Sequence, residues 1–409
     1  MLDDPHSAPE TSRWLLRRAP RFARLWAAKA VFHVGDGAAL VALVVYVQQT
    51  QRRGVAVSAL LLADTLPTLL GPLAGTLADR VEQRRLMLAA QAGQAVLYGA
   101  MAALLPPFPV LLVLVAAASL LATVFAPAGR SVVPNLVGPE DLVRANSWMG
   151  MALTLQGTIG PAVGGLLIAG AGIRGALWGN ALSFAVSAAL VGGLPALAPE
   201  TAEKERVGLL KSTGEGLAYA LGHPVARALI IGLGFGVLFA AVDDVALVFL
   251  AREELHAGAP GYGLLVSVYG IGFALGSLAL MRTRAGGAAA AFSFGLLLSG
   301  AGGLLTGLAP VLGLAAAAQA VAGSGNGLEV VATDTLVQRS VPRSHRGRVF
   351  GVVIAATLLG GAIARGLGGF LLDLTSARAT FVIGGCGVLL VTLVAAVLFR
   401  GAGRGAVDD

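Results

Sequence analysis

The chain has 409 residues, of which 56% are hydrophobic and only 12% are charged, with a net charge of +7 and a mean hydropathy of +0.80. Soluble domains carry roughly 25% charged residues, so this composition excludes an ordinary soluble protein and indicates a polytopic membrane protein. The single cysteine, Cys386, excludes an intramolecular disulfide and a thiolate metal site. In a membrane protein a positive net charge reflects the loops that face the cytoplasm, and we expect no nucleic-acid partner.

The first 23 residues are polar and basic, and they lack the apolar stretch of a cleavable signal peptide. Basic and apolar side chains alternate from Arg13 to Arg18 and again from Arg21 to Trp26. We predict that residues 1–23 form a cytoplasmic segment at the membrane interface. A disordered tail as far as Pro20 is the alternative.

Twelve apolar stretches follow, each long enough for a spanning helix, which needs about 20 mostly apolar residues. They lie at 24–48, 57–78, 86–105, 108–129, 146–170, 175–197, 225–250, 261–282, 288–308, 311–337, 348–373 and 378–400. The sequence therefore predicts an all-α integral membrane protein with twelve transmembrane helices. Its predicted parts after the first segment are a six-helix bundle over 24–198, a cytoplasmic central loop over 199–223, a second six-helix bundle over 224–400 and a cytoplasmic tail over 401–409.

The basic residues are unequally divided between the two sets of loops. Of the 29 lysines and arginines, one alternate set of loops holds only Arg52, Arg53, Arg174, Arg252 and Arg378. Loops rich in lysine and arginine stay on the cytoplasmic side, so we predict that both termini and the central loop are cytoplasmic. The abundance of alanine, glycine and arginine is typical of a GC-rich bacterial genome, which indicates a bacterial plasma membrane.

An internal repeat relates the two predicted bundles. Gly157 to Leu167 lies 204 positions before the similar stretch from Gly361 to Leu371. Basic turns of similar character precede the two stretches, at 139–144 and 342–348. Equivalent halves of this kind predict two pseudo-symmetric bundles with a binding site between them.

The short connection between the second and third spans is rich in glycine and charge. Glycines allow close helix packing, and an acid beside an arginine forms a strong ionic hydrogen bond. Such a connection suits helices that move between two states, although its arginines are also interpretable as topology signals alone. Its residues of interest are Gly71, Gly75, Asp79, Arg80, Arg84 and Arg85.

These residues resemble the major facilitator superfamily, in which a Gly-x-Leu-Ala-Asp-Arg motif followed by basic residues joins helices 2 and 3. Gly160-Pro161-x-x-Gly164-Gly165 resembles the helix-5 motif of the antiporter branches, although Gln156 stands near where a further glycine is usual. The branch of enterobactin exporters and macrolide efflux proteins is similar at three places. These are Phe125 to Ala128 with Arg130, then Pro134, and then Arg144-Ala145-Asn146.

The resemblance implies a conformational latch at the cytoplasmic end of the bundle. Its predicted members are Gly75, Asp79, Arg80 and Arg84, with Arg130 as the basic partner of Asp79. The resemblance also implies a gating helix that bends and packs closely through Gly160, Pro161, Gly164 and Gly165. Close packing without gating is the alternative for these four residues.

Acids within the spans are further candidates, because a charge at the bilayer centre costs about 2.5–3.5 kcal/mol on insertion scales. A carboxylate in a partly dry cavity is able to bind and release a proton near neutral pH. We predict Asp36, Asp243, Asp244 and Glu329 as candidates for proton coupling, with Asp36 first. Helices 1, 7 and 10, which hold them, line the central cavity in the family that the chain resembles. Structural pairing with a neighbouring helix is the alternative.

Arg365 takes, in the second repeat, the position that Pro161 has in the first. A permanent cation inside a span needs a partner, which we predict to be Glu329 or an acid on helix 7. His33 precedes Asp36 by three residues on the same helix face, where it could tune Asp36. The candidate substrate contacts are Gln91, Gln94, Asn180 and Asn326, for which interhelical hydrogen bonds are the alternative.

The chain contains no phosphate-binding loop, nucleophile elbow or cysteine–histidine cluster, so we expect no enzyme activity, no cofactor and no bound metal. The sequence predicts a monomeric secondary transporter whose partners are a small-molecule substrate, protons and the lipid bilayer. We expect it to be a proton-coupled exporter of an amphipathic molecule such as an antibiotic or a siderophore. A nutrient importer of the same fold and a membrane sensor that transports nothing are the alternatives.

Overall fold

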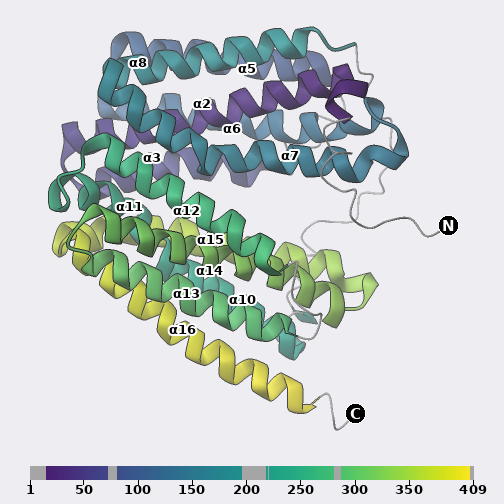
Figure 1. Ribbon diagram of the computed structural model, residues 1–409, viewed down its shortest axis with the longest axis vertical. Helices are drawn as coiled ribbons and strands as arrows, with labels where there is room; N and C mark the ends of the chain where they lie inside the picture. The colour runs from purple at the N-terminus through teal and green to yellow at the C-terminus, as the bar shows by residue number, and fades with distance from the viewer. Residues whose placement is uncertain (1–14, 72–80, 196–217, 220, 281–286, 406–409) are drawn as a thin grey trace. The chain divides into compact units, whose positions relative to one another are not determined.

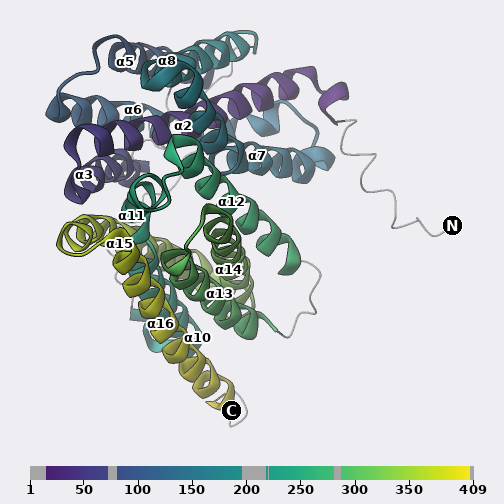
Figure 2. The same ribbon diagram turned by 60° about the vertical axis from the view of Figure 1, so that its left-hand side comes forward.

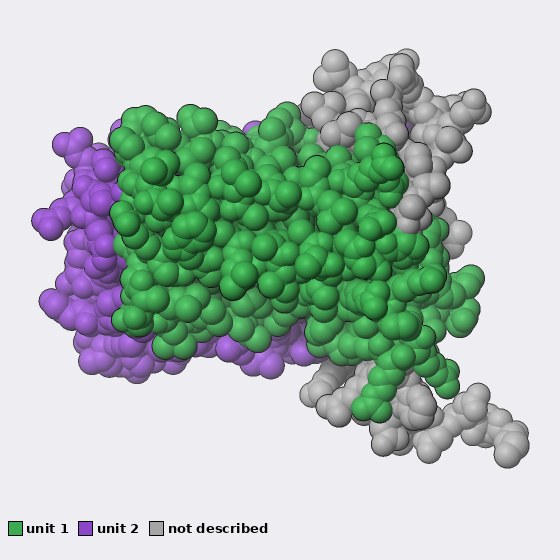
Figure 3. Space-filling view, turned by 90° about the horizontal axis from the view of Figure 1, so that it is seen from above, with its two compact units in different colours: residues 1–43, 63–203 green, residues 44–62, 204–409 purple. Residues whose placement is uncertain are grey.

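The computed structural model describes residues 15–71, 81–195, 218–219, 221–280 and 287–405, and the regular elements in these ranges are all helical (Figure 1). The predicted all-α class is therefore confirmed. Contacts divide the chain into two compact units, which Figure 3 shows in two colours. Unit 1 comprises residues 1–43 and 63–203, and unit 2 comprises residues 44–62 and 204–409.

In unit 1, α5 packs against α6 and α8 (Figure 1). The helix α5 ends at Leu104 and is followed by Leu105, which has a left-handed φ of 42°. The next helix, α6, begins after Pro106-Pro107, where a helix cannot continue. The elements are the first part of α2 (Pro20–Gln51), η1 (Leu66–Leu70), α5 (Gln83–Leu104), α6 (Phe108–Ser131), η2 (Val133–Asn135), η3 (Pro139–Asp141), α7 (Leu142–Gly157) and α8 (Ile159–Gly192).

Unit 2 joins the end of α2 and most of α3 (Gly54–Thr65) to the helices of the second half. Within it, α14 packs against α12 and α13, and α16 packs against α10 and α13 (Figure 2). Its other elements are α10 (Pro224–Ala240), α11 (Asp243–Phe249), the single π-turn η4 (Leu250–Glu254), α12 (Gly258–Leu280), α13 (Ala288–Leu308), α14 (Leu312–Ser340), α15 (Arg343–Leu374) and α16 (Ala377–Gly405).

Small residues let these helices approach to backbone contact. Gly325 of α14 lies against Gly295 of α13, where an added Cβ would stand 2.4–2.7 Å from the facing carbonyl oxygens. Gly323 and Gly327 lie in the same way against α12. Association of helices in lipid depends on such van der Waals packing, because hydrocarbon supplies no hydrophobic driving force between them.

Nine stretches among the described residues are long and apolar enough to cross a membrane. The stretch Pro139–Gly192 has 54 residues and accommodates two crossings, because α8 bends at Gly172, where φ is 71° and ψ is −179°. Gly54–Leu70 is a shorter apolar helix, and α14 is long but carries polar side chains. Together these account for the twelve predicted spans.

Large apolar side chains are exposed along the helices, as a lipid environment requires. Val113, Leu166 and Leu393 are each about two-thirds exposed, and they belong to different helices. A water-facing surface rarely shows apolar patches of this extent. The protein is therefore a multi-pass membrane protein.

Within the residues that the structure describes, the fifth and seventh predicted spans each contain a break. The fifth is interrupted at Thr158, between α7 and α8, where φ is −110° and ψ is −74°. The seventh is interrupted at Ala241 and Val242, between α10 and α11. Hydropathy does not detect such breaks, because the residues on both sides are equally apolar.

By their contacts residues 44–62 belong to unit 2, and the boundaries of the two predicted bundles stay predictions. Of the predicted interfacial segment, residues 15–18 form a helical turn before α2, and Leu15 and Phe22 are buried. Most of the predicted central loop lies outside the described residues, so the predicted loop and tail boundaries stay predictions.

Candidate functional site

The internal repeat is visible in the packing of each unit. In unit 1, a Cβ added to Gly164 of α8 would stand 2.5 Å from the carbonyl oxygen of Ala38 in α2. In unit 2, a Cβ added to Gly368 of α15 would stand 2.8 Å from the carbonyl oxygen of Val242. The two pairs are related by the offset of 204 residues seen in the sequence. The repeated helices therefore pack in the same register in both units.

Asp36 lies where α2 crosses α7 and α8, and glycines make this crossing close. A Cβ at Gly160 would stand 3.0 Å from the Cα of Gly37, and a Cβ at Gly37 would overlap the backbone oxygen of Gln156. The predicted gating residues Gly160 and Gly164 thus hold α2 at backbone distance beside Asp36. Pro161 and Gly165 are buried in the same turn of α8.

The substitution Gly37→Ala is expected to destabilise the protein, because the new methyl group would overlap the carbonyl oxygen of Gln156. Overpacking of this kind typically costs about 1–3 kcal/mol. The measurement is the melting temperature of the purified variant. Gly150→Ala is the matched control, since a Cβ at Gly150 meets no atom within 4 Å. Equal melting temperatures for the two variants would contradict the close contact.

Gln156 connects Asp36 with His33. Its Nε2 donates to Oδ2 of Asp36 at 2.7 Å, and its Oε1 lies 3.0 Å from Nδ1 of His33. Because the amide oxygen accepts, His33 donates through Nδ1–H. Gln156 was noted in the sequence only as a departure from a glycine-rich motif, and its place in the site was not predicted.

Further groups surround Asp36. Asp64 and Tyr98 lie close enough to interact with it electrostatically. The ring of Tyr98 packs on Phe184 with 5.3 Å between centroids, and the ammonium of Lys29 lies 4.5 Å from the ring centroid of Phe125. A half-buried carboxylate near a second acid and a tyrosine is suited to binding and releasing a proton.

The adjacent aspartates of α11 face different neighbours. Oδ2 of Asp244 lies 2.9 Å from Nη2 and 3.1 Å from Nε of Arg365. Asp243 turns toward α13, where its Oδ2 would stand 3.9 Å from a Cβ at Gly303. This divergence follows from the separation of about 100° between successive helix positions.

The ion pair of Arg365 corrects one of our predictions. The acid on the seventh predicted helix, Asp244, is the partner of Arg365, and Glu329 is not. The reason is the packing, since α11 lies against α15, whereas the side chain of Glu329 lies against Gly295 of α13.

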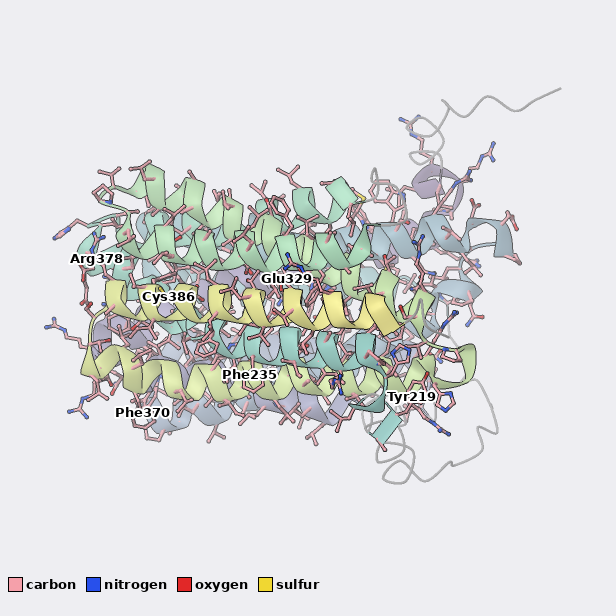
Figure 4. All side chains as sticks on the ribbon, turned by 90° about the horizontal axis from the view of Figure 1, so that it is seen from below. Tyr219, Phe235, Glu329, Phe370, Arg378 and Cys386 are labelled. Carbon is pink, nitrogen blue, oxygen red and sulfur yellow. The ribbon has the colours of Figure 1, made fainter. Side chains whose placement is uncertain are left out.

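Glu329 is buried midway along unit 2, between Arg378 at one end and Tyr219 at the other (Figure 4). Among the described residues its Oε1 has no hydrogen-bond partner, and Ser299 is its hydrogen-bonding neighbour. Tyr269 of α12 lies close enough to interact electrostatically with Asp243, Asp244 and Glu329. The sequence analysis did not predict Tyr269 as part of the site. Its hydroxyl group within an apolar span was the feature that could have indicated it.

The predicted latch lies mostly outside the described part of the chain. This applies to Gly75, Asp79 and Arg80, and to the side chain of Arg130 in α6. Arg84 is described, and its Nη2 donates to the carbonyl oxygen of Gly192 at 2.5 Å. Arg24 donates in the same way to Gly193 at 3.0 Å. The contact of Arg84 is a cap on the carboxyl end of α8, and the predicted part of Arg84 in the latch stays a prediction.

Three of the predicted substrate contacts are fully buried. Gln91, Gln94 and Asn180 are at most 1% exposed, because the face of α5 that holds both glutamines packs against α6 and α8. In this structure these side chains are closed to a substrate, in contrast to the prediction. Asn326 of α14 is half-buried.

At one end of unit 2 the turn between α2 and α3 is held by polar contacts. Asp373 of α15 accepts from the backbone N–H groups of Gly54, at 2.5 Å, and Val55, at 3.2 Å, and so caps α3. Gln48 donates to Glu253 at 2.6 Å and also bonds Arg252. The loops of Arg52, Arg252 and Arg378, which the charge pattern placed on one side, thus lie near the same end of unit 2.

Comparison with known proteins decides the family. A family model described as transmembrane secretion effector, within the major facilitator superfamily, matches residues 11–402. The chain belongs to this family. The predicted membership of the superfamily is confirmed, and the protein is a secondary transporter rather than an enzyme.

The relatives of this transporter cover nearly its whole length. It is 27% identical over 393 residues to the uncharacterized MFS-type transporter YfiS of Bacillus subtilis, with 93% of each chain covered. It is 27% identical over 399 residues to the enterobactin exporter EntS of Escherichia coli O1:K1, with 92% of this chain and 91% of that chain covered.

Solved structures confirm the fold. A variant of the nucleoside transporter NupG is similar with a TM-score of 0.79 at 13% identity, over 93% of this chain and 100% of that one. A bacterial homologue of the human lysosomal transporter Spinster is similar with a TM-score of 0.69 at 15% identity, over 95% and 97% of the chains. At these identities the likeness concerns the fold alone.

Proposed function

We propose that this transporter exports a small amphipathic molecule, such as an antibiotic or a siderophore, from a bacterial cytoplasm in exchange for protons. The observation that carries the proposal is the position of Asp36, an acid set where α2 meets the gating glycines of α8. The family description and the enterobactin exporters among the relatives support the direction of transport.

Gln156 couples the protonation of Asp36 to the break between α7 and α8. The charged carboxylate accepts from Nε2 of Gln156. When the proton binds Oδ2, that oxygen becomes a hydroxyl donor, and we propose that the amide of Gln156 turns to accept it with Oε1. The turned amide then presents Nε2 to His33, whose Nδ1 accepts after its proton has moved to Nε2 of the same ring. Because Gln156 precedes the break at Thr158 by two residues, one proton changes the hydrogen bonds at the start of the gating helix.

The contacts of residues 44–62 with α15 form a second element that we expect to change during transport. Alternating access requires contacts that form in one state and break in the other. The cap that Asp373 places on α3 and the hydrogen bond from Ser58 to the carbonyl oxygen of Arg365 at 2.5 Å fit this requirement. We assign them to a gate at the outer membrane surface, where the charge pattern puts these loops.

The substitution Asp373→Ala is expected to loosen this gate, because losing a helix cap costs about 0.5–2 kcal/mol. The measurement is maleimide labelling of a Ser58→Cys variant in which Cys386 is replaced by serine. Labelling should be faster when Asp373→Ala is added. Glu254→Ala is the matched control, since Glu254 pairs with Arg378 at the same end, at 3.2 Å. Unchanged labelling with Asp373→Ala would contradict the gate.

The export proposal is tested by drug susceptibility. An efflux-deficient bacterium expressing the chain is compared with strains that express Asp36→Asn or Asp141→Asn over a panel of antibiotics and siderophores. Asp141 is the matched control, because it pairs with Arg144 at the helix start and lies away from Asp36. The proposal expects raised tolerance with the wild type and Asp141→Asn, and none with Asp36→Asn. Protein present in the membrane without tolerance to any compound would contradict it.

A further inference from the structure

Buried polar side chains line the facing surfaces of α5 and α8 in unit 1. On α5 they are Gln91, Gln94 and Tyr98, whose spacing of three and four residues puts them on one face, with Gln94 at its edge, where Nε2 donates to the carbonyl oxygen of Ala118 in α6 at 3.3 Å. On α8 they are Asn180 and Ser187, seven residues apart and so also on one face. None of the five is more than 4% exposed.

The two helices run antiparallel, and three contacts fix their register. Arg84 bonds the carbonyl oxygen of Gly192, the ring of Tyr98 packs on Phe184, and a Cβ at Gly99 would stand 3.5 Å from the ring of Trp178. This register places Gln91 level with Ser187 and Tyr98 level with Asn180. The five side chains therefore form one polar seam, which extends about 10 Å along α5 at 1.5 Å per residue.

Several polar atoms of the seam have no hydrogen-bond partner within the part of the chain that the structure describes. They are both amide atoms of Gln91, Oε1 of Gln94, Nδ2 of Asn180 and Oγ of Ser187. Leaving a buried polar group unpaired costs about 1–3 kcal/mol, and such groups in proteins are usually satisfied by buried water.

The chemistry of the seam favours water over a cation. Gln91 offers an unpaired donor and an unpaired acceptor, so its partner must both donate and accept. The unpaired amide nitrogen of Asn180 would repel a cation, and the seam itself contains no carboxylate. Water meets both requirements.

At its Tyr98 end the seam comes within electrostatic reach of Asp36. A Cβ added to Gly35, the residue before Asp36, would stand 2.5 Å from Oδ1 of Asn180. The other end points along α5 toward Arg84, where Oε1 of buried Gln83 is also unpaired. Met87, a flexible side chain, interrupts this polar face between them.

We propose that the seam holds a file of water molecules that carries the proton between Asp36 and the Arg84 end of unit 1. The inference rests on the proposed function and deepens it, because it assigns the proton a path inside unit 1 that the substrate does not share. Each water molecule accepts one proton and donates another to the next water. The net result is the transfer of one proton along the file, and every water molecule remains neutral. The charge pattern makes the Arg84 end cytoplasmic.

The charged and titratable neighbours of Asp36 come from three described helices. Asp64 is on α3, Tyr98 is on α5 and His33 is on α2 itself, and Lys29 of α2 lies within electrostatic reach of His33. The groups that α7 and α8 present at the crossing are neutral, namely Gln156, Asn180 and Ser183. The side chains of the seam are therefore uncharged, and the charged groups near Asp36 do not belong to the seam.

Water in the seam is tested by hydroxyl-radical footprinting of the purified full chain in nanodiscs, with water itself as the probe. Radicals formed from buried water label adjacent side chains, and Tyr98 and Met87 are both reactive and buried. Phe292 is the dry control, since it is buried in the apolar cluster of unit 2. Labelling of Tyr98 and Met87 well above Phe292 is expected. Tyr98 labelled no more than Phe292 would overturn the proposal.

The proton path is tested with Gln91→Leu, which keeps the side-chain volume and removes the polar atoms. After a pH jump, the carboxyl infrared band that Asp36→Asn lacks is followed in time. The band should appear several-fold more slowly in Gln91→Leu, with unchanged amplitude. Val96→Leu is the control, because Val96 lies exposed on the same helix. A rate equal to that of the wild type would overturn the path.

A second variant and an independent readout keep the two proposals separate. Ser187→Ala should also slow the band, and it substitutes for Gln91→Leu if that variant fails to fold. If Asp36→Asn exported normally, the proton step of the proposed function would fail, and the footprint would still decide whether the seam holds water. If export needed Asp36 but the seam variants exchanged protons at the wild-type rate, only the path would fail.

Discussion

Replacing Asp36 by asparagine is expected to abolish proton-driven export while the protein stays folded in the membrane. Asparagine cannot take up a proton, so the cycle loses the step that couples the gradient to the gating helix. It retains an oxygen that accepts from Gln156, so the bridge to His33 is preserved. The variant therefore removes the charge change and leaves the packing at Gly37 and Gly160 intact.

Two assays separate the coupling role of Asp36 from a structural one. Uphill export driven by a pH gradient should fall to the background of the empty vector. Exchange of labelled for unlabelled compound without a gradient should continue, because exchange needs alternating access but no net proton movement. Loss of both activities together with a lowered melting temperature would indicate a structural role and contradict the coupling role.

Breaking the ion pair between Asp244 and Arg365 is expected to have the second largest effect. Arg365→Gln leaves Asp244 unpaired within the span, and Asp244→Asn leaves Arg365 unpaired. An unpaired charge at the bilayer centre costs about 2.5–3.5 kcal/mol on insertion scales, and less where water reaches it. Each single variant should therefore lower the melting temperature and impair transport.

The double variant tests whether the two side chains act as a pair. Neutralising both charges removes the unpaired ion, so Asp244→Asn with Arg365→Gln should regain most of the stability that either single change loses. Glu329→Gln with Arg365→Gln is the matched control and should show no such recovery, since Glu329 lies against α13. Recovery in the control instead of in the Asp244 pair would contradict the observed partner.

The sequence predicted the number and order of the spans because hydropathy reports directly on contact with lipid. It did not predict the break at Thr158 or the membership of residues 44–62 in unit 2, because both depend on contacts between helices. For the partner of Arg365 the sequence left two candidates, Glu329 or an acid on helix 7. The packing of α11 on α15 in the structure identifies the partner as Asp244.

The sequence indicated the acids of the candidate site and did not indicate the groups that surround them. Asp36 was identifiable, because a charge within an apolar span is unusual in itself. Gln156 and Tyr269 carry no such signal, since uncharged polar residues occur in many membrane helices. Gln91 and Asn180 were assigned to the substrate because their residue types suit hydrogen bonding, whereas only the register of α5 and α8 shows that they face each other.

The central claim, that protons bound at Asp36 drive export, is tested most directly in everted membrane vesicles that have been acidified inside. A compound identified by the susceptibility panel is added, and a pH-sensitive dye reports protons that leave the vesicles. The account predicts proton release on addition of the compound to wild-type vesicles and none with Asp36→Asn. Transport of the compound by the wild type without proton movement, or equal proton release from both, would contradict it.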